Sequence, residues 1–449
     1  MNNKKEGRDL TQGNLVKNML IIFFPLLFTH LLSSIYSFVD GIWIGKIIGE
    51  RGISVSANVY PILFLVMAVG FGLGAATSVL ISQYYGAKDN NSIKKVVKVS
   101  VISTATILFV FNLANALFSN MWLKIMDTPK EVWNETRVYF IIYLVAYFLD
   151  FILMNILESL RAIGNTKFPI IVVSITTILN IVIDPILLKT PLGINGAAVS
   201  TVISISVGLI LAITYVNTKS NLLNWNFKEI EFDKEIFYKF VKIAIPMILQ
   251  EWFIGIIIIY EVRIANRTGV EGSASYGVVD KLEQIVWILG ESFNSMIRIF
   301  VGQFFGDKKY DESKEIMSKG MIMELLPNIV IGTLIYVIPY QLCRIFLSND
   351  VVIQSAIRFL RVIGIVMITT LPRSVVRGFI GGTGHTKIML IGSIVSGAAD
   401  MITMFALSRA GIDNLIVIGI GSTVYMAVES ILYVIYYYSN KWKKNVIEN

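Results

Sequence analysis

Twelve long apolar stretches divide this chain, and they constrain its fold more than any other feature. Each is long enough for a helix to cross the roughly 30 Å hydrocarbon layer of a membrane. Only 16% of the 449 residues are charged, whereas a soluble protein carries about a quarter. We therefore predict an all-α integral membrane protein with twelve transmembrane helices, at residues 15–39, 54–83, 96–120, 137–158, 168–189, 196–216, 238–265, 273–298, 315–346, 352–376, 386–408 and 414–438.

Lysine and arginine are distributed unequally between the alternating loops. The loops and helix ends on the side of the N-terminus hold about 26 of them, and the opposite side holds about 12, which by the positive-inside rule places both termini in the cytoplasm. Basic residues scattered over loops that face anionic lipid also account for the net charge of +8. We therefore expect membrane lipids as partners and no nucleic acid.

The two halves of the chain repeat each other at an offset of about 220 residues. Residues 81–88 (ISQYYGAK) resemble 301–308 (VGQFFGDK), and 164–167 (GNTK) resemble 384–387 (GHTK). We therefore predict two pseudo-symmetric six-helix lobes, 1–216 and 236–449, joined by a cytoplasmic linker at 217–235. Six helices per lobe give both lobes the same orientation, an arrangement in which transporters move one lobe against the other around a central site.

Two aspartates of the first half lie inside predicted spans. Asp40 follows the helix-bending Pro25 by fifteen residues, and Asp184 lies four residues after Asn180, so that these two share a helix face. A charge at the centre of a membrane costs about 3 kcal/mol on insertion scales, so we expect both acids to face the interior of the lobe. Tyr36, one turn before Asp40, and Thr201 are candidate hydrogen-bonding partners. A shared site suits a group that binds and releases a proton or another cation.

The second half carries acids at related places. At an offset of 221, Pro246 and Glu261 take the places of Pro25 and Asp40, and at an offset of 220 Asp400 takes the place of Asn180. Glu261 has Arg263 and Arg267 nearby, so an ion pair and a cleft-lining role both stay open. Asp280 shares one face of its helix with two glutamates, which favours a water-lined surface. In the first half, Glu158 is expected to be solvated at the inner end of its helix.

The sequence lacks the motifs of an enzyme. The two histidines lie far apart, the single cysteine excludes a thiolate zinc site, and no GxxxxGK[ST] phosphate-binding loop is present. We therefore expect no catalytic residue, no cofactor and no resident metal, apart from a possible Na⁺ at the acidic site.

The chain resembles the multidrug and toxic compound extrusion (MATE) family over nearly its whole length. The resemblance rests on VDGIWIGKIIG after Pro25, and on GFGLGAATSVLISQYYGAKD, RAIGNTKFPIIVVSITTILNIVIDPILL, GINGAAVSTVIS, IPMILQ and FVGQFFGDKK. It implies a monomeric multi-pass protein of the bacterial inner membrane. Its activity would be secondary antiport by alternating access, which exports small cationic or amphipathic compounds in exchange for H⁺ or Na⁺.

The resemblance also implies a site in the N-terminal lobe, as in the bacterial branch that keeps its acids there. The cation would bind at Asp40, Asn180 and Asp184, with supporting contacts from Tyr36, Tyr139, Asn155 and Thr201. Glu261 matches an acid that other branches use, whereas their acid on the tenth helix has no counterpart. Two alternatives stay open: a lipid-linked saccharide or lipid II flippase of the same superfamily, and a channel or receptor that only binds.

Overall fold

The protein is described by a computed structural model, which covers residues 6–225, 231–346, 349–369 and 373–443. Helices build this described part, and it contains no β-strand. Eleven of its helices are long and apolar enough to cross a membrane. The prediction of an all-α multi-pass membrane protein is confirmed.

The chain divides into two compact units. Unit 1 comprises Met1–Ile248 and Gly306–Lys308, and unit 2 comprises Leu249–Phe305 and Lys309–Asn449. Because the boundary between the units falls inside a helix, the predicted linker at 217–235 and the lobes on either side of it stay a prediction.

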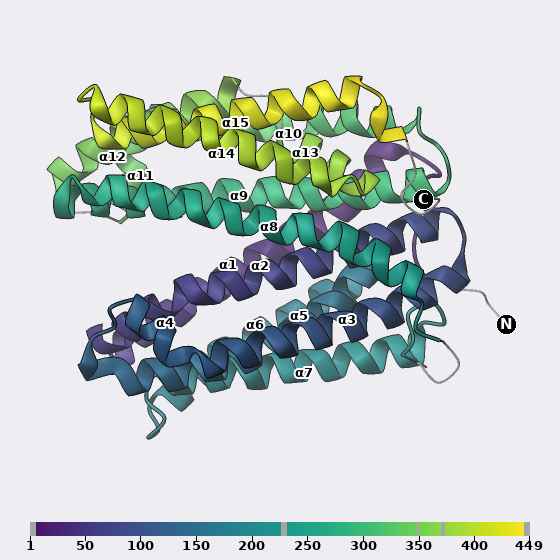
Figure 1. Ribbon diagram of the computed structural model, residues 1–449, viewed down its shortest axis with the longest axis horizontal. Helices are drawn as coiled ribbons and strands as arrows, with labels where there is room; N and C mark the ends of the chain where they lie inside the picture. Colours follow the sequence, from purple (N-terminus) through teal and green to yellow (C-terminus); the bar gives the residue numbers. More distant parts are fainter. Residues whose placement is uncertain (1–5, 226–230, 347–348, 370–372, 444–449) are drawn as a thin grey trace. The chain divides into compact units, whose positions relative to one another are not determined.

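Unit 1 is built from long helices with one short helix between them (Figure 1). α2 packs against α3 and α5, α5 packs against α7, and α6 packs against both α1 and α7. The acids of the first half therefore lie on neighbouring helices, α1 and α6. The bounds are α1 Leu15–Ile47, α2 Glu50–Gly86, α3 Asn90–Leu117, α4 Ser119–Ile125, α5 Trp133–Ala162, α6 Lys167–Leu188 and α7 Asn195–Lys219, with a 3-10 turn at Lys130–Val132.

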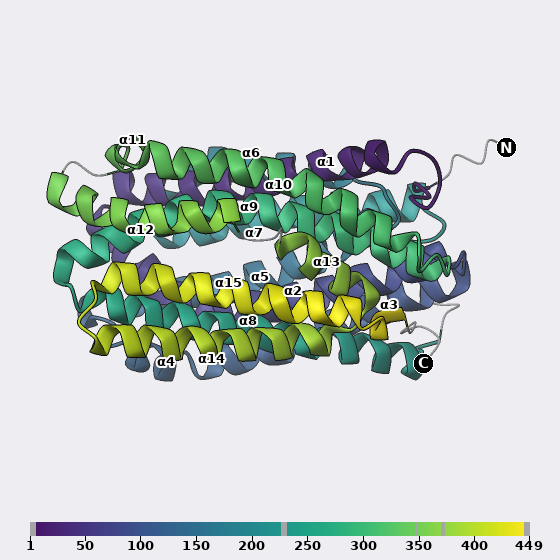
Figure 2. The same cartoon turned by 90° about the horizontal axis from the view of Figure 1, so that it is seen from above.

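Unit 2 contains most of the remaining helices. α14 and α15 lie side by side, as Figure 2 shows, and α12 packs against both α10 and α15. α8 contributes to both units because the boundary falls at residues 248 and 249. The bounds are α8 Lys234–Asn266, α9 Gly269–Gly306, α10 Ser313–Val337, α11 Pro339–Arg344, α12 Asp350–Thr369, α13 Arg373–Thr383, α14 Thr386–Arg409 and α15 Asn414–Tyr438, with a 3-10 turn at Lys441–Lys443.

The structure divides one segment that the sequence analysis treated as a single continuous span. The predicted span 315–346 is divided between α10 and α11, because Pro339 begins a new helix after Ile338. The predicted span 352–376 contains most of α12 and the first residues of α13, and its residues 370–372 lie outside the described part. Neither α12, which carries Arg358 and Arg361, nor α13, which has only 11 residues, is among the eleven helices that are long and apolar enough to cross a membrane.

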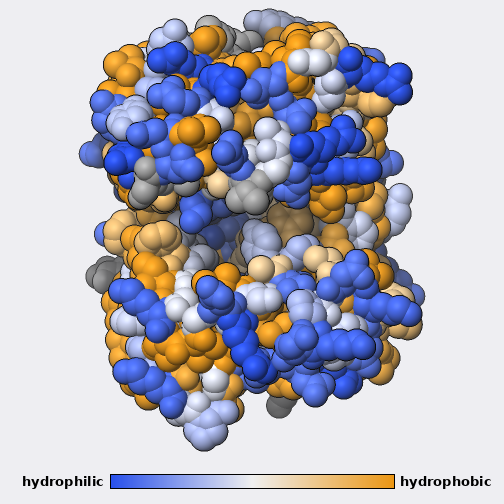
Figure 3. All heavy atoms as spheres, turned by 90° about the vertical axis from the view of Figure 1, so that its left-hand side faces the viewer, coloured by the Kyte–Doolittle hydropathy of each residue, from blue (hydrophilic) through white to orange (hydrophobic). Residues whose placement is uncertain are grey.

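Many large apolar side chains along the helices are exposed, as expected for helices that stand in a membrane. The helix ends that face the viewer in Figure 3 carry many hydrophilic side chains. In unit 1 the starts of α2 and α5 carry an exposed ion pair, in which Arg51 Nε lies 2.8 Å from Glu135 Oε2. Charges at helix ends stay in water while the flanks meet lipid.

The backbone repeats at the offset that the sequence predicts. Glycines at the paired positions 49 and 269, and 164 and 384, have a positive φ, of 79° and 77°, and of 82° and 82°. Lys88 and Lys308 do the same with φ of 58°, although a side chain makes this conformation uncommon. Residues that share an uncommon dihedral at equal spacing show that the two halves use the same turns.

The segment before α1 is bound to one end of unit 1. The Glu6 carboxylate accepts hydrogen bonds from Ser220 Oγ at 2.7 Å and from the Asn221 backbone N–H at 2.6 Å. The Arg8 backbone N–H donates to the Ile163 carbonyl at 2.8 Å. The N-terminal segment, the end of α5 and the residues after α7 therefore lie at the same end of this unit.

Asp233 connects the start of α8 to α3 through hydrogen bonds. Its carboxylate accepts from the backbone N–H of Ile236, at 3.1 Å, and from Lys95 Nζ, at 3.0 Å. Partial burial alone would raise the pKa of Asp233, but these hydrogen bonds and the lysine charge hold it below its usual value. Asp233 is therefore an ionised helix cap at neutral pH.

Candidate functional site

A buried pair of carboxyl groups lies inside unit 1. The carboxyl groups of Asp40 of α1 and Asp184 of α6 lie close enough to interact with each other. Asp184 is fully buried and Asp40 is half-buried. Two carboxyl groups can hydrogen-bond to each other only when a proton lies between them, because two adjacent negative charges repel. The pair can therefore hold and release a proton.

Amide and hydroxyl groups from α6 and α7 surround Asp184. Asn180 Nδ2 donates to Ser200 Oγ at 2.8 Å and to Thr201 Oγ1 at 3.3 Å. Ser200 Oγ in turn donates to a carboxylate oxygen of Asp184. Tyr36 OH and Thr201 Oγ1 are 2.9 Å apart, which connects α1 to the same group. This arrangement holds Asp184 in one position through a chain of side-chain hydrogen bonds.

Tyrosines of α5 form another side of this site. Tyr139 and Tyr143 are buried, their ring centroids lie 4.7 Å apart, and both are close enough to Asp40 to interact with its charge. The sequence analysis selected Tyr139 and missed Tyr143, although a spacing of four on one helix would have indicated a shared face. The site thus combines two acids with amide, hydroxyl and aromatic groups.

Asn155 is not part of this group. Its Nδ2 donates to Thr77 Oγ1 at 2.9 Å and to Thr104 Oγ1 at 3.2 Å, while its Oδ1 accepts from Ser100 Oγ at 3.2 Å. Sixteen residues separate it from Tyr139 on α5, which is about 24 Å along a helix. Asn155 instead joins α2, α3 and α5 through their polar side chains.

Glu158 corrects an expectation from the sequence. It is not solvated but buried, with a side-chain exposure of 5%, and its carboxylate lies 2.6 Å from Arg161 Nη1. Arginine three residues later on the same helix compensates for its charge, which makes burial possible. Sequence position near a helix end did not reveal that this end is packed.

The two predicted residues of unit 2 lie in separate surroundings. The Glu261 carboxylate accepts from Tyr276 OH at 3.0 Å and from Ser422 Oγ at 3.1 Å, so hydroxyl groups rather than the two nearby arginines hold it. Asp280 accepts from Gln284 Nε2 of its own helix at 3.1 Å. Ser422 stands at an offset of 221 from Thr201, so Glu261 occupies the part of unit 2 that repeats the Asp40 site.

A second group of buried charges in unit 2 was missed by the sequence analysis. Arg373 of α13 binds Glu429 of α15, and Arg377 of α13 lies 2.7 Å from Glu251 of α8. Glu324 of α10 accepts from the Val375 backbone N–H at 3.0 Å, at the beginning of α13. Three glutamates from three helices thus hold the short helix α13. Arginines within an apolar region could have indicated this group, but the partner of Arg373 lies 56 residues away in the sequence and that of Arg377 lies 126 residues away.

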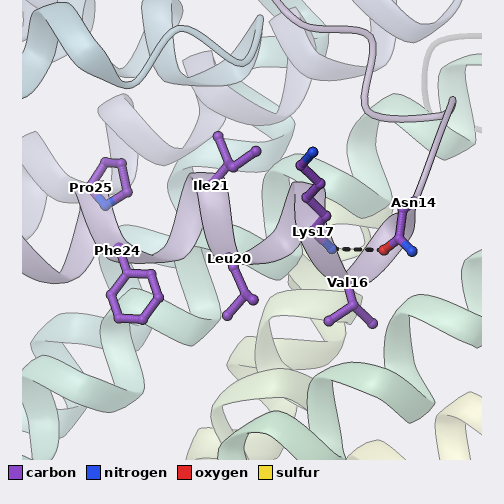
Figure 4. A pocket seen from close by; sticks show the side chains of 7 residues that line it. All are labelled: Asn14, Val16, Lys17, Leu20, Ile21, Phe24 and Pro25. Carbon is purple, nitrogen blue, oxygen red and sulfur yellow. Dashed lines mark hydrogen bonds between the residues drawn. The ribbon is translucent and has the colours of Figure 1, made fainter.

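The start of α1 borders an open hollow that is distinct from the carboxyl pair. Figure 4 shows the side chains that line it, with Asn14 Oδ1 accepting from the Lys17 backbone N–H at 2.9 Å. Pro25 is at one end of this lining, about 22 Å along the helix from Asp40. Its predicted role as the helix bend stays a prediction. The lining residues are Asn14, Val16, Lys17, Leu20, Ile21, Phe24 and Pro25.

No group of three or more histidine, cysteine, aspartate or glutamate side chains among the described residues could hold a metal ion. The possible Na⁺ at Asp40, Asn180 and Asp184 stays a prediction.

Fold and site together define a class of protein. Ionisable groups that are buried within membrane-spanning helices and are bound to each other are typical of polytopic proteins that move ions or solutes. The comparison with known proteins identifies the family. The MatE family model matches residues 25–186 and again residues 243–404, so the chain belongs to the MatE family and contains two copies of its characteristic region.

Relatives match most of the chain. It is 25% identical over 354 residues to the probable multidrug resistance protein YoeA of Bacillus subtilis, covering 77% of this chain and 76% of the relative. It is 27% identical over 401 residues to the multidrug export protein MepA of Staphylococcus aureus, covering 87% of each. The MATE transporter VcmN of Vibrio cholerae, in its bent form, has the same fold, with a TM-score of 0.84, 20% identity and coverage of 94% and 96%. The predicted two-lobe MATE fold is confirmed.

Proposed function

We propose that the protein is a proton-coupled antiporter that exports small cationic or amphipathic compounds. The single observation that supports this best is the contact between the carboxyl groups of Asp40 and Asp184 inside unit 1. When the two carboxyl groups are in contact, the pair must contain a proton. It can then accept a positively charged compound only after it has released that proton. Competition for one negative charge therefore couples the two movements.

The surrounding side chains support the exchange. Asn180 and Ser200 hold Asp184 in place, and one oxygen of Asp40 has no hydrogen-bond partner among the described residues. Asp184 is held rigidly and Asp40 is more accessible. This arrangement suits a site in which Asp40 exchanges a proton for a positively charged compound. Tyr139 and Tyr143 add aromatic faces, which attract organic cations.

The proposed substrates and location follow from the relatives. YoeA is named a probable multidrug resistance protein and MepA a multidrug export protein, and both are bacterial. We infer a similar range of organic substrates for this chain. We also infer a place in the cytoplasmic membrane, with both termini inside the cell and the protein acting as a monomer.

The test is efflux of a fluorescent organic cation from proteoliposomes under separately imposed proton and sodium gradients. We expect the proton gradient to drive efflux, and Asp40→Asn and Asp184→Asn each to reduce the gradient-driven rate at least tenfold, because an amide keeps the shape but carries no exchangeable charge. Asp127→Asn is the matched control, since Asp127 is exposed at the end of α4 and should leave efflux unchanged.

Three results would contradict the proposal in distinguishable ways. If only a sodium gradient drives efflux, the coupling ion at this site is Na⁺ rather than a proton. If efflux survives in both aspartate variants, the coupling site does not lie in unit 1. Transfer of a lipid-linked saccharide without export of organic cations would favour a flippase.

A further inference from the structure

Asp400 of α14 is an acid without a partner in the interior of unit 2. It is fully buried, and within the described residues neither of its carboxyl oxygens has a hydrogen-bond partner. Two other acids of this unit differ. Glu429 accepts from Arg373, Ser393 and Tyr433, and Glu261 accepts from two hydroxyl groups.

The surroundings of Asp400 are apolar and tightly packed. A Cβ atom added to Gly421 of α15 would overlap Asp400 Oδ1 and would also meet the Met404 side chain. Phe253 and Ile257 of α8 pack against Gly397, one turn before Asp400 on the same helix. The carboxyl group therefore rests on the bare backbone of Gly421 rather than against a donor.

The repeat explains why this position is polar. At an offset of 220, Asp400 stands at the place of Asn180 and Met404 at the place of Asp184. Gly421, at an offset of 221 from Ser200, lies against Asp400 and Met404 as Ser200 lies against Asn180 and Asp184. In unit 1 the amide, the hydroxyl and the acid bond to one another. In unit 2 glycine and methionine take the places of the serine and the aspartate, and Asp400 takes the place of the asparagine.

The charges on the packed helices offer Asp400 no compensation. From α8 it faces Glu261, which has the same sign and acts on it electrostatically. α13 also packs against α14, but its two arginines are bound to Glu429 and Glu251. On α15, the next turn after Gly421 carries Tyr425, which is directed to Glu429.

We propose that Asp400 is a proton-binding site of unit 2 and that it carries its proton in the conformation described here. An ionised carboxylate without a hydrogen bond or an opposite charge is so costly in an apolar interior that the group neutralises instead. The ligand is a proton rather than a metal cation, because hard cations need several oxygen ligands, whereas Gly421 and Met404 present carbon and sulfur atoms.

Infrared spectroscopy of the purified full chain in detergent tests this proposal, because a protonated carboxyl group has a C=O stretching band that an ionised one lacks. At neutral pH we expect Asp400→Asn to lose the intensity of one protonated carboxyl group per chain. An amide occupies the equivalent position in unit 1, so this variant should fold. Asp400→Leu, which replaces the neutral acid by an apolar group, is a second variant with the same expected loss.

The matched control is Asp413→Asn. Asp413 caps α15 at a partly exposed position and forms an ion pair with Arg358, so this variant should lose no such intensity. Unchanged intensity in a folded Asp400 variant would overturn the proposal. The result is independent of the proposed function: a lost band in a protein whose efflux ignores protons would contradict only the antiport, and an unchanged band with proton-driven efflux would contradict only the role of Asp400.

Discussion

At Ser200, one hydroxyl group serves two neighbours. It accepts a hydrogen bond from Asn180 and donates one to Asp184, so that a single small side chain keeps the amide and the acid in a fixed arrangement. Each of these side chains is at most 2% exposed, so water cannot replace a lost partner. An unsatisfied buried group costs about 1–3 kcal/mol, and more when it is charged.

Ser200→Ala should therefore weaken both the fold and the coupling. We expect a loss of about 2 kcal/mol in the free energy of unfolding, and a reduction of proton-driven efflux of roughly tenfold, the factor that corresponds to about 1.4 kcal/mol. Thermal unfolding in detergent and efflux from proteoliposomes measure the two effects. Ser206→Ala is the control, because Ser206 lies on the same helix and donates only to the Val202 backbone carbonyl. Equal behaviour of the two variants would contradict the role of Ser200.

Sequence spacing could predict part of this site. A separation of four residues places Asn180 and Asp184 on one helix face, and the cost of charge in lipid directs both inward. Spacing along one helix says nothing about which hydroxyl group of another helix comes between them. That depends on the contact between α6 and α7, which is why Ser200 was missed while its neighbour Thr201 was selected.

On the scale of single elements, α13 is unusual because other helices hold it at three points. Its arginines bind Glu429 and Glu251, and Glu324 accepts a backbone N–H of its first turn. A helix of 11 residues is marginal by itself. Contacts with α8, α10 and α15 therefore determine where this segment lies.

Breaking one of these ion pairs should be costly. Glu429→Gln would leave Arg373 with an unpaired charge in a largely buried place, so we expect a loss of about 3 kcal/mol, the lower end of the range for a broken buried pair, because Arg373 keeps 25% of its side chain exposed. The double variant Arg373→Gln, Glu429→Gln should recover part of this loss. Thermal unfolding of the three proteins in detergent measures both effects.

Glu135→Gln provides the comparison for an exposed pair. Glu135 binds Arg51 with side-chain exposures of 38% and 56%, and such pairs contribute less than about 1 kcal/mol. The interpretation of α13 would be wrong if the Glu429 and Glu135 variants unfolded at the same temperature.

Hydrophobic patterning predicted the long helices but not the interruption before Pro339. Proline can begin a helix, so the apolar run through Pro339 reads as one span although two helices share it. Apolar content therefore predicts where chain crosses the membrane better than where a helix stops.

On the scale of the whole molecule, the alternation of inner and outer loops is open to a direct test. We predict that an external membrane-impermeant thiol reagent labels Lys130→Cys, in the loop before α5, and fails to label Asn91→Cys, at the start of α3, in sealed cells. Both positions are exposed, so access to the reagent decides the outcome. The positive-inside asymmetry is the physical reason.

The background for this experiment is Cys343→Ala, which removes the single native thiol. Permeabilised cells provide the control, because both positions should then react. External labelling of Asn91→Cys with protection of Lys130→Cys would invert the proposed orientation while leaving the fold unchanged.

The matched residues of the two halves with positive φ bear on the history of this chain. Glycines 49 and 269, glycines 164 and 384, and lysines 88 and 308 share a positive φ, whereas two buried positions later in each half differ, with Asp184 and Ser200 in one half and Met404 and Gly421 in the other. Duplication of an ancestral six-helix gene would produce this pattern. After such a duplication one copy can retain the chemistry while the other drifts inside an unchanged scaffold, so that functional asymmetry arises without a new fold.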